Sequence, residues 1–248
     1  MGSCFDMITE LRRRDGAGFA VLLDPDKLSQ DGLREQIAQY EDAGVDAFFV
    51  GGSLVHSTDA CKALDRLKDI CSLPLIGFPG SVQQISGALD AVLYLSIVSG
   101  RNPDFLFGRH LYVAPVIKRL GIESISTAYM LVESGPLTTA QYLNHSLPLP
   151  RTKPELAAAT ALAAEMMGMK AMYLDGGSGA EQPVPVEMIA AVRNTVEAPV
   201  IVGGGLRDAD SISVRVSAGA DIIVVGNALE KGASNADLKS MVAAAHGA

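Results

Sequence analysis

The chain has 248 residues, of which 48% are hydrophobic and 19% are charged, and its formal net charge is −8. This length suits one large domain or two small ones, and α/β barrels routinely occupy it as one domain. The acidic balance argues against a nucleic-acid partner, because neutralising phosphates takes clustered Lys and Arg, and no apolar run reaches the roughly 18 residues of a membrane span.

Cysteine use and the N-terminal segment indicate the compartment. Cys4, Cys61 and Cys71 are odd in number and lack CxxC spacing, so they predict reduced thiols in a cytoplasmic protein and no zinc site. Arg12-Arg13-Arg14 are not followed by an apolar run of the signal-peptide type. Only residues 8–14 resemble a basic amphipathic helix, so we expect any membrane contact to be peripheral.

The first part of the chain predicts alternating helices and buried strands. Residues 1–17 predict a helix with a basic flank. Continuous apolar runs predict strands over 19–23, 47–50, 73–76, 91–95 and 124–132. Apolar residues at helical spacing predict helices over 30–43, about 59–70 and 104–120, the last with a kink at Pro115. The connection after the third strand is short for a crossover helix, and residues 136–154 predict the longest irregular connection.

The second part repeats the alternation. A helix over 154–168 is followed by strands over 171–174, 199–202 and 221–225, by helices at about 185–196 and 208–217, and by a last helix from near Ala228. Eight strand–helix units with no linker between them predict a single-domain (β/α)₈ TIM barrel over residues 1–248, with an irregular or shortened helix after the third strand. The first helix would cover the bottom of the barrel. An open doubly wound sheet is the alternative, which eight evenly spaced units disfavour.

Glycines end the last three predicted strands. They occur in Tyr173-Leu174-Asp175-Gly176-Gly177-Ser178-Gly179, in Gly203-Gly204-Gly205 and in Gly226-Asn227. Glycine lets the backbone turn tightly and approach a ligand, and successive N–H groups in such turns form a concavity for an anion. The three ends together predict one phosphate-binding site, and three ordinary strand-to-helix turns are the alternative.

Polar residues at the other strand ends predict a metal site. In a barrel of this type the active site lies at the carboxyl ends of the strands. Asp24 and Ser53 follow the first and second predicted strands, and a carboxylate with a hydroxyl suits Mg²⁺, which keeps water and phosphate oxygens as its other ligands. Alternatively, Asp24 forms a cap or Asx turn before Pro25 and Ser53 caps a helix.

Asp175 is the candidate general base. It lies between the predicted phosphate turn and the barrel centre, where a carboxylate can reach a substrate hydroxyl. The alternative is a carboxylate that caps the turn after it. Tyr173 is a candidate to hydrogen bond the substrate, and packing within the barrel is as good an explanation for it.

Eight motifs resemble one family of barrel enzymes, and they follow the family order from about residue 19 to 230. They are Leu23-Asp24-Pro25-Asp26-Lys27, Val50-Gly51-Gly52-Ser53, Phe78-Pro79-Gly80-Ser81, residues 95–103, residues 126–133, residues 173–179, residues 202–207 and Val225-Gly226-Asn227. The chain resembles the geranylgeranylglyceryl phosphate synthase family, which includes the bacterial heptaprenylglyceryl phosphate synthases. The stretches Ser99-Gly100-Arg101-Asn102-Pro103 and Thr127-Ala128-Tyr129 are the most specific, since glycine turns fit many barrel enzymes.

The resemblance implies a prenyltransferase that joins a polyprenyl diphosphate to the 3-hydroxyl of sn-glycerol 1-phosphate. It implies Mg²⁺ on Asp24 and Ser53, with Asp175 and Tyr173 as catalytic residues. The residues implied to bind glycerol phosphate are Tyr173, Leu174, Asp175, Gly176, Gly177, Ser178, Gly179, Gly204, Gly205, Gly226 and Asn227. The chain departs from the family pattern at Asp175, where glutamate is usual, so a closer substrate, a relaying water or another base would be needed.

The prenyl tail needs an apolar groove that leaves the barrel mouth. Candidate lining residues are Phe78, Tyr94, Phe105, Phe107, Tyr112 and Tyr129, for which ordinary packing is an equal alternative. The Ser-Gly-Arg-Asn-Pro type of motif favours a geranylgeranyl donor over a heptaprenyl one. The resemblance also predicts a homo-oligomer, either a dimer or a hexamer.

Two other functions stay open at the level of sequence. One is a different phosphate-handling barrel enzyme, such as an isomerase or synthase of histidine or tryptophan biosynthesis, which would work without Mg²⁺. The other is a barrel that binds glycerol phosphate without turnover, which only the Glu-to-Asp change at Asp175 supports.

Overall fold

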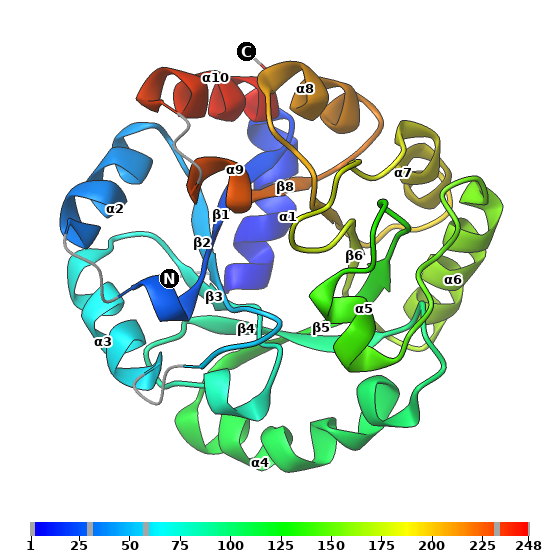
Figure 1. The fold of residues 1–248 in the computed structure, drawn as a ribbon, viewed down its shortest axis with the longest axis horizontal. Helices are drawn as coiled ribbons and strands as arrows, with labels where there is room; N and C mark the ends of the chain where they lie inside the picture. The colour runs from blue at the N-terminus through cyan, green and yellow to red at the C-terminus, as the bar shows by residue number, and fades with distance from the viewer. Residues whose placement is uncertain (1–2, 29–31, 57–59, 231–233, 248) are drawn as a thin grey trace.

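Eight parallel strands close into a barrel in the computed structural model, which describes residues 3–28, 32–56, 60–230 and 234–247 (Figure 1). The strands are β1 Gly18–Leu23, β2 Ala47–Val50, β3 Leu75–Gly77, β4 Ala91–Ile97, β5 Glu123–Leu131, β6 Ala171–Asp175, β7 Val200–Gly203 and β8 Ile222–Val225. Each pairs with its neighbours in the chain, and β1 closes the ring against β8, with Val21 opposite Val225. The (β/α)₈ architecture predicted from the sequence is confirmed.

Side chains alternate between the barrel interior and the layer under the helices. The interior residues include Ala20, Phe49, Ile76, Leu93, Tyr129, Leu131, Tyr173, Ile201 and Val224. The outer residues, which pack against helices, include Phe19, Val21, Phe48, Val50, Met130, Met172, Leu174, Val202 and Ile223. Both faces are buried, which is why the strands are continuous apolar runs. The same alternation turns Tyr173 and Asp175 toward the interior and Leu174 toward the helices.

Helices surround the barrel, as Figure 1 shows. They are α2 Leu33–Asp42, α3 Ala60–Ile70, α4 His110–Leu120, α6 Pro154–Met166, α7 Val186–Arg193, α8 Ala209–Ser217 and α10 Asn235–His246. After β3 the chain forms only the 3₁₀ turn Val82–Gln84, as predicted. The predicted helix over 104–120 begins as a π-helical segment, Asp104–Gly108, before α4, which contains Pro115. No helix among the described residues is both long enough and apolar enough to cross a membrane.

Two connections differ from the prediction. The segment predicted to be irregular contains the short helix α5 Thr139–Asn144, and Val132 forms a bridge with Leu149. Reciprocal hydrogen bonds between Thr138 and Gln141 cap α5, so a polar segment without clear apolar periodicity still forms a helical turn. The predicted last helix is two helices, the short α9 Asn227–Glu230 and α10, which begins after its own cap at Ser234.

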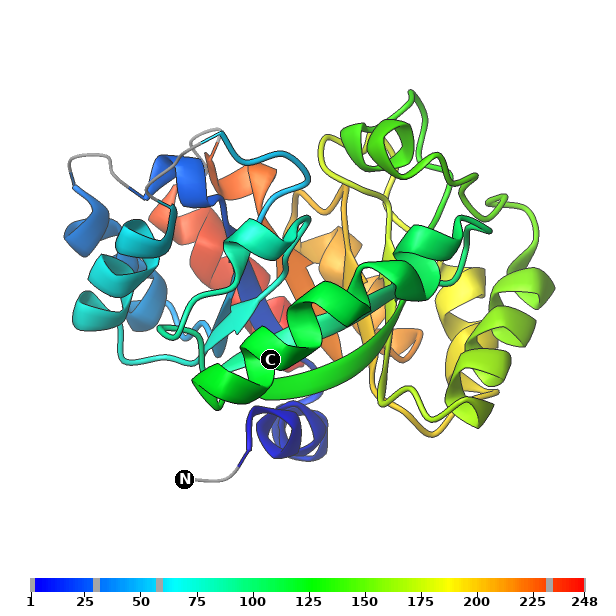
Figure 2. The ribbon, with the colours of Figure 1, turned by 90° about the horizontal axis from the view of Figure 1, so that it is seen from below.

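The end of the barrel opposite α5 is closed by α1 Cys4–Asp15, which lies across it (Figure 2). Ile8 of α1 is fully buried and packs with the interior residues of the barrel. This confirms that the first helix covers the bottom. The carboxyl ends of the strands are therefore the open end, the mouth.

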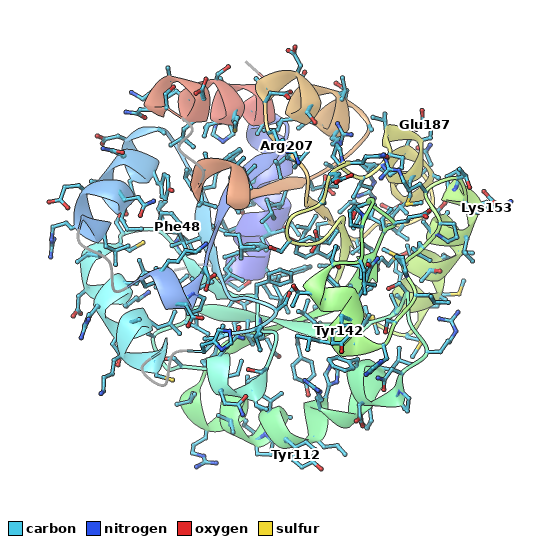
Figure 3. All side chains as sticks on the ribbon, in the orientation of Figure 1. Phe48, Tyr112, Tyr142, Lys153, Glu187 and Arg207 are labelled. Atoms are coloured by element: carbon cyan, nitrogen blue, oxygen red, sulfur yellow. The ribbon has the colours of Figure 1, made fainter. Side chains whose placement is uncertain are left out.

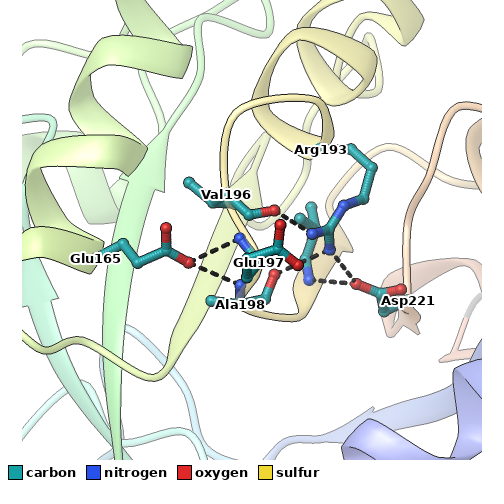
Figure 4. Close-up of polar contacts among 7 residues, drawn as sticks. Glu165, Arg193, Val196, Glu197, Ala198 and Asp221 are labelled. Atoms are coloured by element: carbon teal, nitrogen blue, oxygen red, sulfur yellow. Dashed lines mark hydrogen bonds and ion pairs between the residues drawn. The ribbon is translucent and has the colours of Figure 1, made fainter.

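A buried ion pair holds the bottom ends of β7 and β8 together (Figure 4). Arg193 Nη1 lies 3.0 Å from Asp221 Oδ2, and the same oxygen accepts the Val200 N–H at 2.8 Å. Arg193 also donates to the carbonyl of Ala198, whose N–H donates to Glu165 Oε1 at 2.8 Å. The network joins α6, α7 and both strand starts, far from the mouth.

Candidate active site

One cavity of about 810 Å³ opens at the mouth, where the carboxyl ends of the strands meet. It has a polar part and an apolar part. The polar part is lined by Asp24, Ser53, Tyr173, Asp175, Gly177, Ser178, Gly179, Gly204, Gly205, Arg207 and Gly226. The apolar part is lined by Phe78, Val92, Tyr94, Leu95, Phe105, Val113, Ile117 and Leu143. The structure therefore brings most of the predicted site residues together in one space.

Asp24 and Ser53 lie at the ends of β1 and β2, and both line the cavity. Asp24 Oδ1 accepts the Asp26 N–H at 3.0 Å, so Asp24 caps the 3₁₀ turn Pro25–Lys27, as one interpretation of the sequence held. Its Oδ2 lies 3.9 Å from Lys27 Nζ, and the side chain is 33% exposed. Capping thus occupies one carboxylate oxygen and leaves the other with a long ionic contact.

The Ser53 loop is held by Gln84, which the sequence analysis did not single out. Gln84 is buried, donates to the Gly52 carbonyl at 2.8 Å, and accepts the Gly52 N–H at 3.2 Å. A Cβ on Gly51 would lie 1.8 Å from the Phe78 carbonyl oxygen, so this loop packs directly on the segment after β3. No described residue hydrogen bonds to the Ser53 hydroxyl. The loop is rigidly placed and its hydroxyl is available for a ligand.

The oxygen atoms of Asp24 and Ser53 suit Mg²⁺ better than they suit a metal ion whose ligands all come from the protein. The residues that the structure describes contain no group of three or more His, Cys, Asp or Glu side chains placed to hold a metal ion. Mg²⁺ is usually held by one or two carboxylates, with water and substrate phosphates completing its octahedron. Asp24 and Ser53 supply such a partial set of oxygen ligands beside an open cavity.

Asp175 is buried at the end of β6 with both carboxylate oxygens hydrogen bonded. Oδ2 accepts the Tyr129 hydroxyl at 2.6 Å, and Oδ1 accepts the Gly177 N–H at 2.8 Å. Burial raises the pKa of Asp175 above its ordinary value, and the two hydrogen bonds oppose that rise because they stabilise the carboxylate. Asp175 thus caps its own turn, as the alternative interpretation held, and still lines the cavity.

Tyr173 is packed by aromatic rings. Its ring is stacked on Phe78 with 5.1 Å between centroids and meets Tyr129 edge-on at 5.6 Å. Burial raises the pKa of Tyr173 well above its ordinary value, so the phenol is neutral. No described residue hydrogen bonds to its hydroxyl, and Tyr173 lines the cavity. The Tyr173 ring is therefore packed in the barrel, as one interpretation held, while its hydroxyl has no partner among the described residues.

The glycine turns after β6 and β7 require glycine. Gly177, Gly179, Gly204 and Gly205 have φ of +88°, +80°, +81° and +74°, a region that side chains with a Cβ disfavour. A Cβ on Gly204 would lie 2.7 Å from Asp175 Oδ1. Within the described part of the chain, the N–H groups of Gly179, Gly204 and Gly205 have no acceptor. Such N–H groups beside a cavity suit an anion.

Three predicted substrate-binding residues stand apart. The side chain of Leu174 is fully buried in the outer layer, so it does not face the cavity. The Gly176 N–H donates to the Gly203 carbonyl at 3.0 Å, and Gly176 does not line the cavity. Asn227 begins α9, and its side chain lies outside the described part of the structure.

Four of the six candidate groove residues line the cavity, and two do not. Phe78, Tyr94, Phe105 and Tyr129 line the cavity. Phe107 and Tyr112 point outward and are 65% and 75% exposed, and Figure 3 shows Tyr112 at the outer edge of α4. Phe107 lies in the π-helical segment, and Tyr112 lies in the first turn of α4.

Other polar residues line the cavity without having been predicted as site residues, and Arg207 and His110 are two of them. Arg207 follows the glycine turn of β7, and its Nη2 donates to the Ala180 carbonyl at 3.2 Å. His110, at the start of α4, is buried beside Tyr94. The position of Arg207 directly after three glycines and a leucine was the available signal in the sequence.

Comparison with known proteins gives a consistent assignment. Residues 8–245 match the model of the PcrB family. The chain is 46% identical over 230 residues to a geranylgeranylglyceryl phosphate synthase of Chitinophaga pinensis, covering 93% of this chain and 90% of that protein. It is 43% identical over 235 residues to one of Thermococcus kodakarensis, covering 94% and 92%.

A solved structure agrees along the whole length. The crystal structure of (S)-3-O-geranylgeranylglyceryl phosphate synthase from Thermoplasma acidophilum, in complex with its substrate sn-glycerol-1-phosphate, has a TM-score of 0.91 and 29% sequence identity. The two structures align over 100% of this chain and 100% of the Thermoplasma acidophilum chain.

Proposed function

The chain belongs to the PcrB family, and we propose that it joins a geranylgeranyl group to the 3-hydroxyl of sn-glycerol 1-phosphate in an Mg²⁺-dependent reaction. The resemblance found in the sequence is confirmed, since the matching relatives are geranylgeranylglyceryl phosphate synthases, and the chain is a prenyltransferase of that type. The product would be an ether-linked lipid precursor.

The observation that carries the proposal is one cavity with two chemically different parts. The backbone N–H groups of Gly179, Gly204 and Gly205, which have no acceptor among the described residues, suit the phosphate of a small polar acceptor. The apolar part between β4 and α4 suits a hydrocarbon tail. A reaction that joins a small phosphorylated alcohol to a prenyl chain needs both parts in one space.

The acceptor hydroxyl must lose its proton as the ether bond forms. The Asp175 carboxylate accepts a hydrogen bond from the predicted phosphate turn through the Gly177 N–H, and its raised pKa makes it a stronger base than an ordinary aspartate. The glycine turns would hold the acceptor hydroxyl near the allylic carbon of the prenyl diphosphate, which lowers the entropic part of the barrier.

The leaving diphosphate must be stabilised on the opposite side of the mouth. Asp24 and Ser53 would hold Mg²⁺ there, and the ion would neutralise the negative charge that develops on the diphosphate. Because Asp24 also caps the turn Pro25–Lys27, its carboxylate is held in one orientation.

The choice of donor length is supported by the relatives rather than by the cavity. The named relatives at 41–48% identity are geranylgeranylglyceryl phosphate synthases, which supports a geranylgeranyl donor. A heptaprenyl donor in the same reaction is the alternative.

The test is a turnover assay with Mg²⁺, sn-glycerol 1-phosphate and polyprenyl diphosphates of several lengths, with products read by mass spectrometry. We expect an ether product from geranylgeranyl diphosphate, abolished by EDTA and by Asp24→Asn. Asparagine also caps helical turns, so this variant removes charge and keeps the turn. No product with any donor would contradict the proposal, and a product in EDTA would contradict its dependence on Mg²⁺.

A further inference from the structure

Arg207 lies at the edge of the glycine turns on a rigid support. A Cβ on Gly205 would lie 2.8 Å from the Pro183 nitrogen, so the turn after β7 packs against the backbone of the segment after β6. Leu206 is buried and anchors the next position. Arg207 is exposed and lines the cavity, and it is labelled in Figure 3. Backbone packing therefore fixes the position of the Arg207 Cα at the edge of the cavity.

The guanidinium of Arg207 keeps most of its hydrogen-bonding capacity and all of its charge. Nη2 donates to the Ala180 carbonyl at 3.2 Å, and no other hydrogen bond or ion pair joins Arg207 to the described residues. An arginine has five N–H donors. No carboxylate of the described residues forms an ion pair with this guanidinium, which lies beside the loop 177–180 in a chain whose net charge is −8.

We propose that Arg207 contacts the phosphate of glycerol phosphate and supplies the positive charge that the backbone N–H groups lack. This inference rests on the proposed function. Backbone N–H groups of Gly179, Gly204 and Gly205 carry only partial charges, whereas a phosphate monoester is close to a dianion at pH 7. A guanidinium can donate two parallel hydrogen bonds to phosphate oxygens. Arg207 is then a residue that sets selectivity for a phosphorylated acceptor.

The alternative role for Arg207 is structural: its hydrogen bond to the Ala180 carbonyl would hold the loop after β7 against the loop after β6. Arg151 offers a matched control. Arg151 also joins two loops by hydrogen bonds, since its Nη2 donates to the Pro183 carbonyl at 3.0 Å and its Nη1 donates to the Glu133 carbonyl at 2.9 Å. Arg151 does not line the cavity. Replacing each arginine by methionine keeps a long side chain and removes the charge and the donors.

The experiment measures kcat and KM for both substrates in the wild type, Arg207→Met, Arg207→Lys and Arg151→Met. We expect Arg207→Met to raise KM for sn-glycerol 1-phosphate about tenfold to a hundredfold. KM for geranylgeranyl diphosphate should stay within about twofold, and Arg207→Lys should recover part of the loss because it keeps a positive charge. With glycerol as acceptor, which has no phosphate, Arg207→Met should match the wild type.

Three outcomes would overturn the inference: an unchanged KM in Arg207→Met, an equal rise in Arg151→Met, or an equal relative loss with glycerol. If the wild type gives no product with any donor, the proposed function fails separately. Calorimetry with inorganic phosphate then decides the inference. Weaker binding to Arg207→Met than to the wild type supports it, and equal binding overturns it.

Discussion

The Tyr129 hydroxyl donates a 2.6 Å hydrogen bond to Asp175 Oδ2, which joins a phenol on β5 to the carboxylate that ends β6. The two strands pair in register, with Tyr129 opposite Tyr173 and Leu131 opposite Asp175. The phenol and the carboxylate therefore both lie on the interior face at the mouth. A carboxylate oxygen has a second lone pair, so Asp175 can accept a substrate hydroxyl without breaking this bond.

Asp175→Asn tests the carboxylate as the base. An amide cannot take the proton of the acceptor hydroxyl, so we expect kcat to fall by about a hundredfold or more. Binding of sn-glycerol 1-phosphate, measured by calorimetry, should persist because the glycine turns remain. Asp175→Glu restores the residue usual in the family and should keep kcat within about tenfold. A kcat in Asp175→Asn near that of the wild type would show that another group takes the proton.

Tyr129→Phe should move the acid limb of the pH profile. The hydroxyl stabilises the ionised carboxylate, so removing it raises the pKa of Asp175 further above its ordinary value. The base acts when deprotonated, so the acid limb of kcat/KM should shift to higher pH. Tyr173→Phe is the control, since its hydroxyl does not hydrogen bond to Asp175 among the described residues. Equal shifts in both variants, or none in Tyr129→Phe, would refute this coupling.

Local patterns predicted the barrel well because a strand buried on both faces leaves a direct trace, as in Phe19–Leu23. Two features were not read from these patterns, and both have physical causes. The resemblance placed Leu174 beside Tyr173 and Asp175 in the substrate-binding stretch, yet its side chain packs in the outer layer because strand side chains alternate. Helix α5 was missed because its stability comes from capping by Thr138 rather than from apolar periodicity.

The contacts of the site were less predictable than its position. Tyr129 and Asp175 are 46 residues apart, and only the register of β5 and β6 brings them together. The support of the Ser53 loop by Gln84 depends in the same way on two loops packing backbone to backbone. Motifs show which residue types cluster at the mouth, whereas tertiary packing decides which atoms meet.

Gly204→Ala should damage acceptor binding through contact rather than through strain alone. Gly204 has φ of +81°, and a Cβ there would lie 2.7 Å from Asp175 Oδ1 and 2.8 Å from the Gly177 nitrogen. We expect KM for sn-glycerol 1-phosphate to rise at least tenfold, because the turn must move. Gly168→Ala is the control, with φ of +89° and nothing within 4 Å of the added Cβ. It should lower stability by about 1 kcal/mol and leave KM unchanged, and equal kinetics in the two variants would contradict the prediction.

Asp221→Ala should separate stability from activity. Arg193 and Asp221 are 11% and 1% exposed, so removing the carboxylate leaves a buried guanidinium with only backbone carbonyls as partners and removes the acceptor of the Val200 N–H (Figure 4). Breaking a buried pair from one side costs about 3–5 kcal/mol, which urea unfolding would measure. Glu155→Ala, which removes a surface pair 3.8 Å long with Lys153, should cost less than about 1 kcal/mol. Because the pair lies at the bottom of the barrel, kcat of folded Asp221→Ala should equal that of the wild type. A large fall in kcat would mean that the bottom of β7 and β8 positions the glycine turns at the other end of these strands.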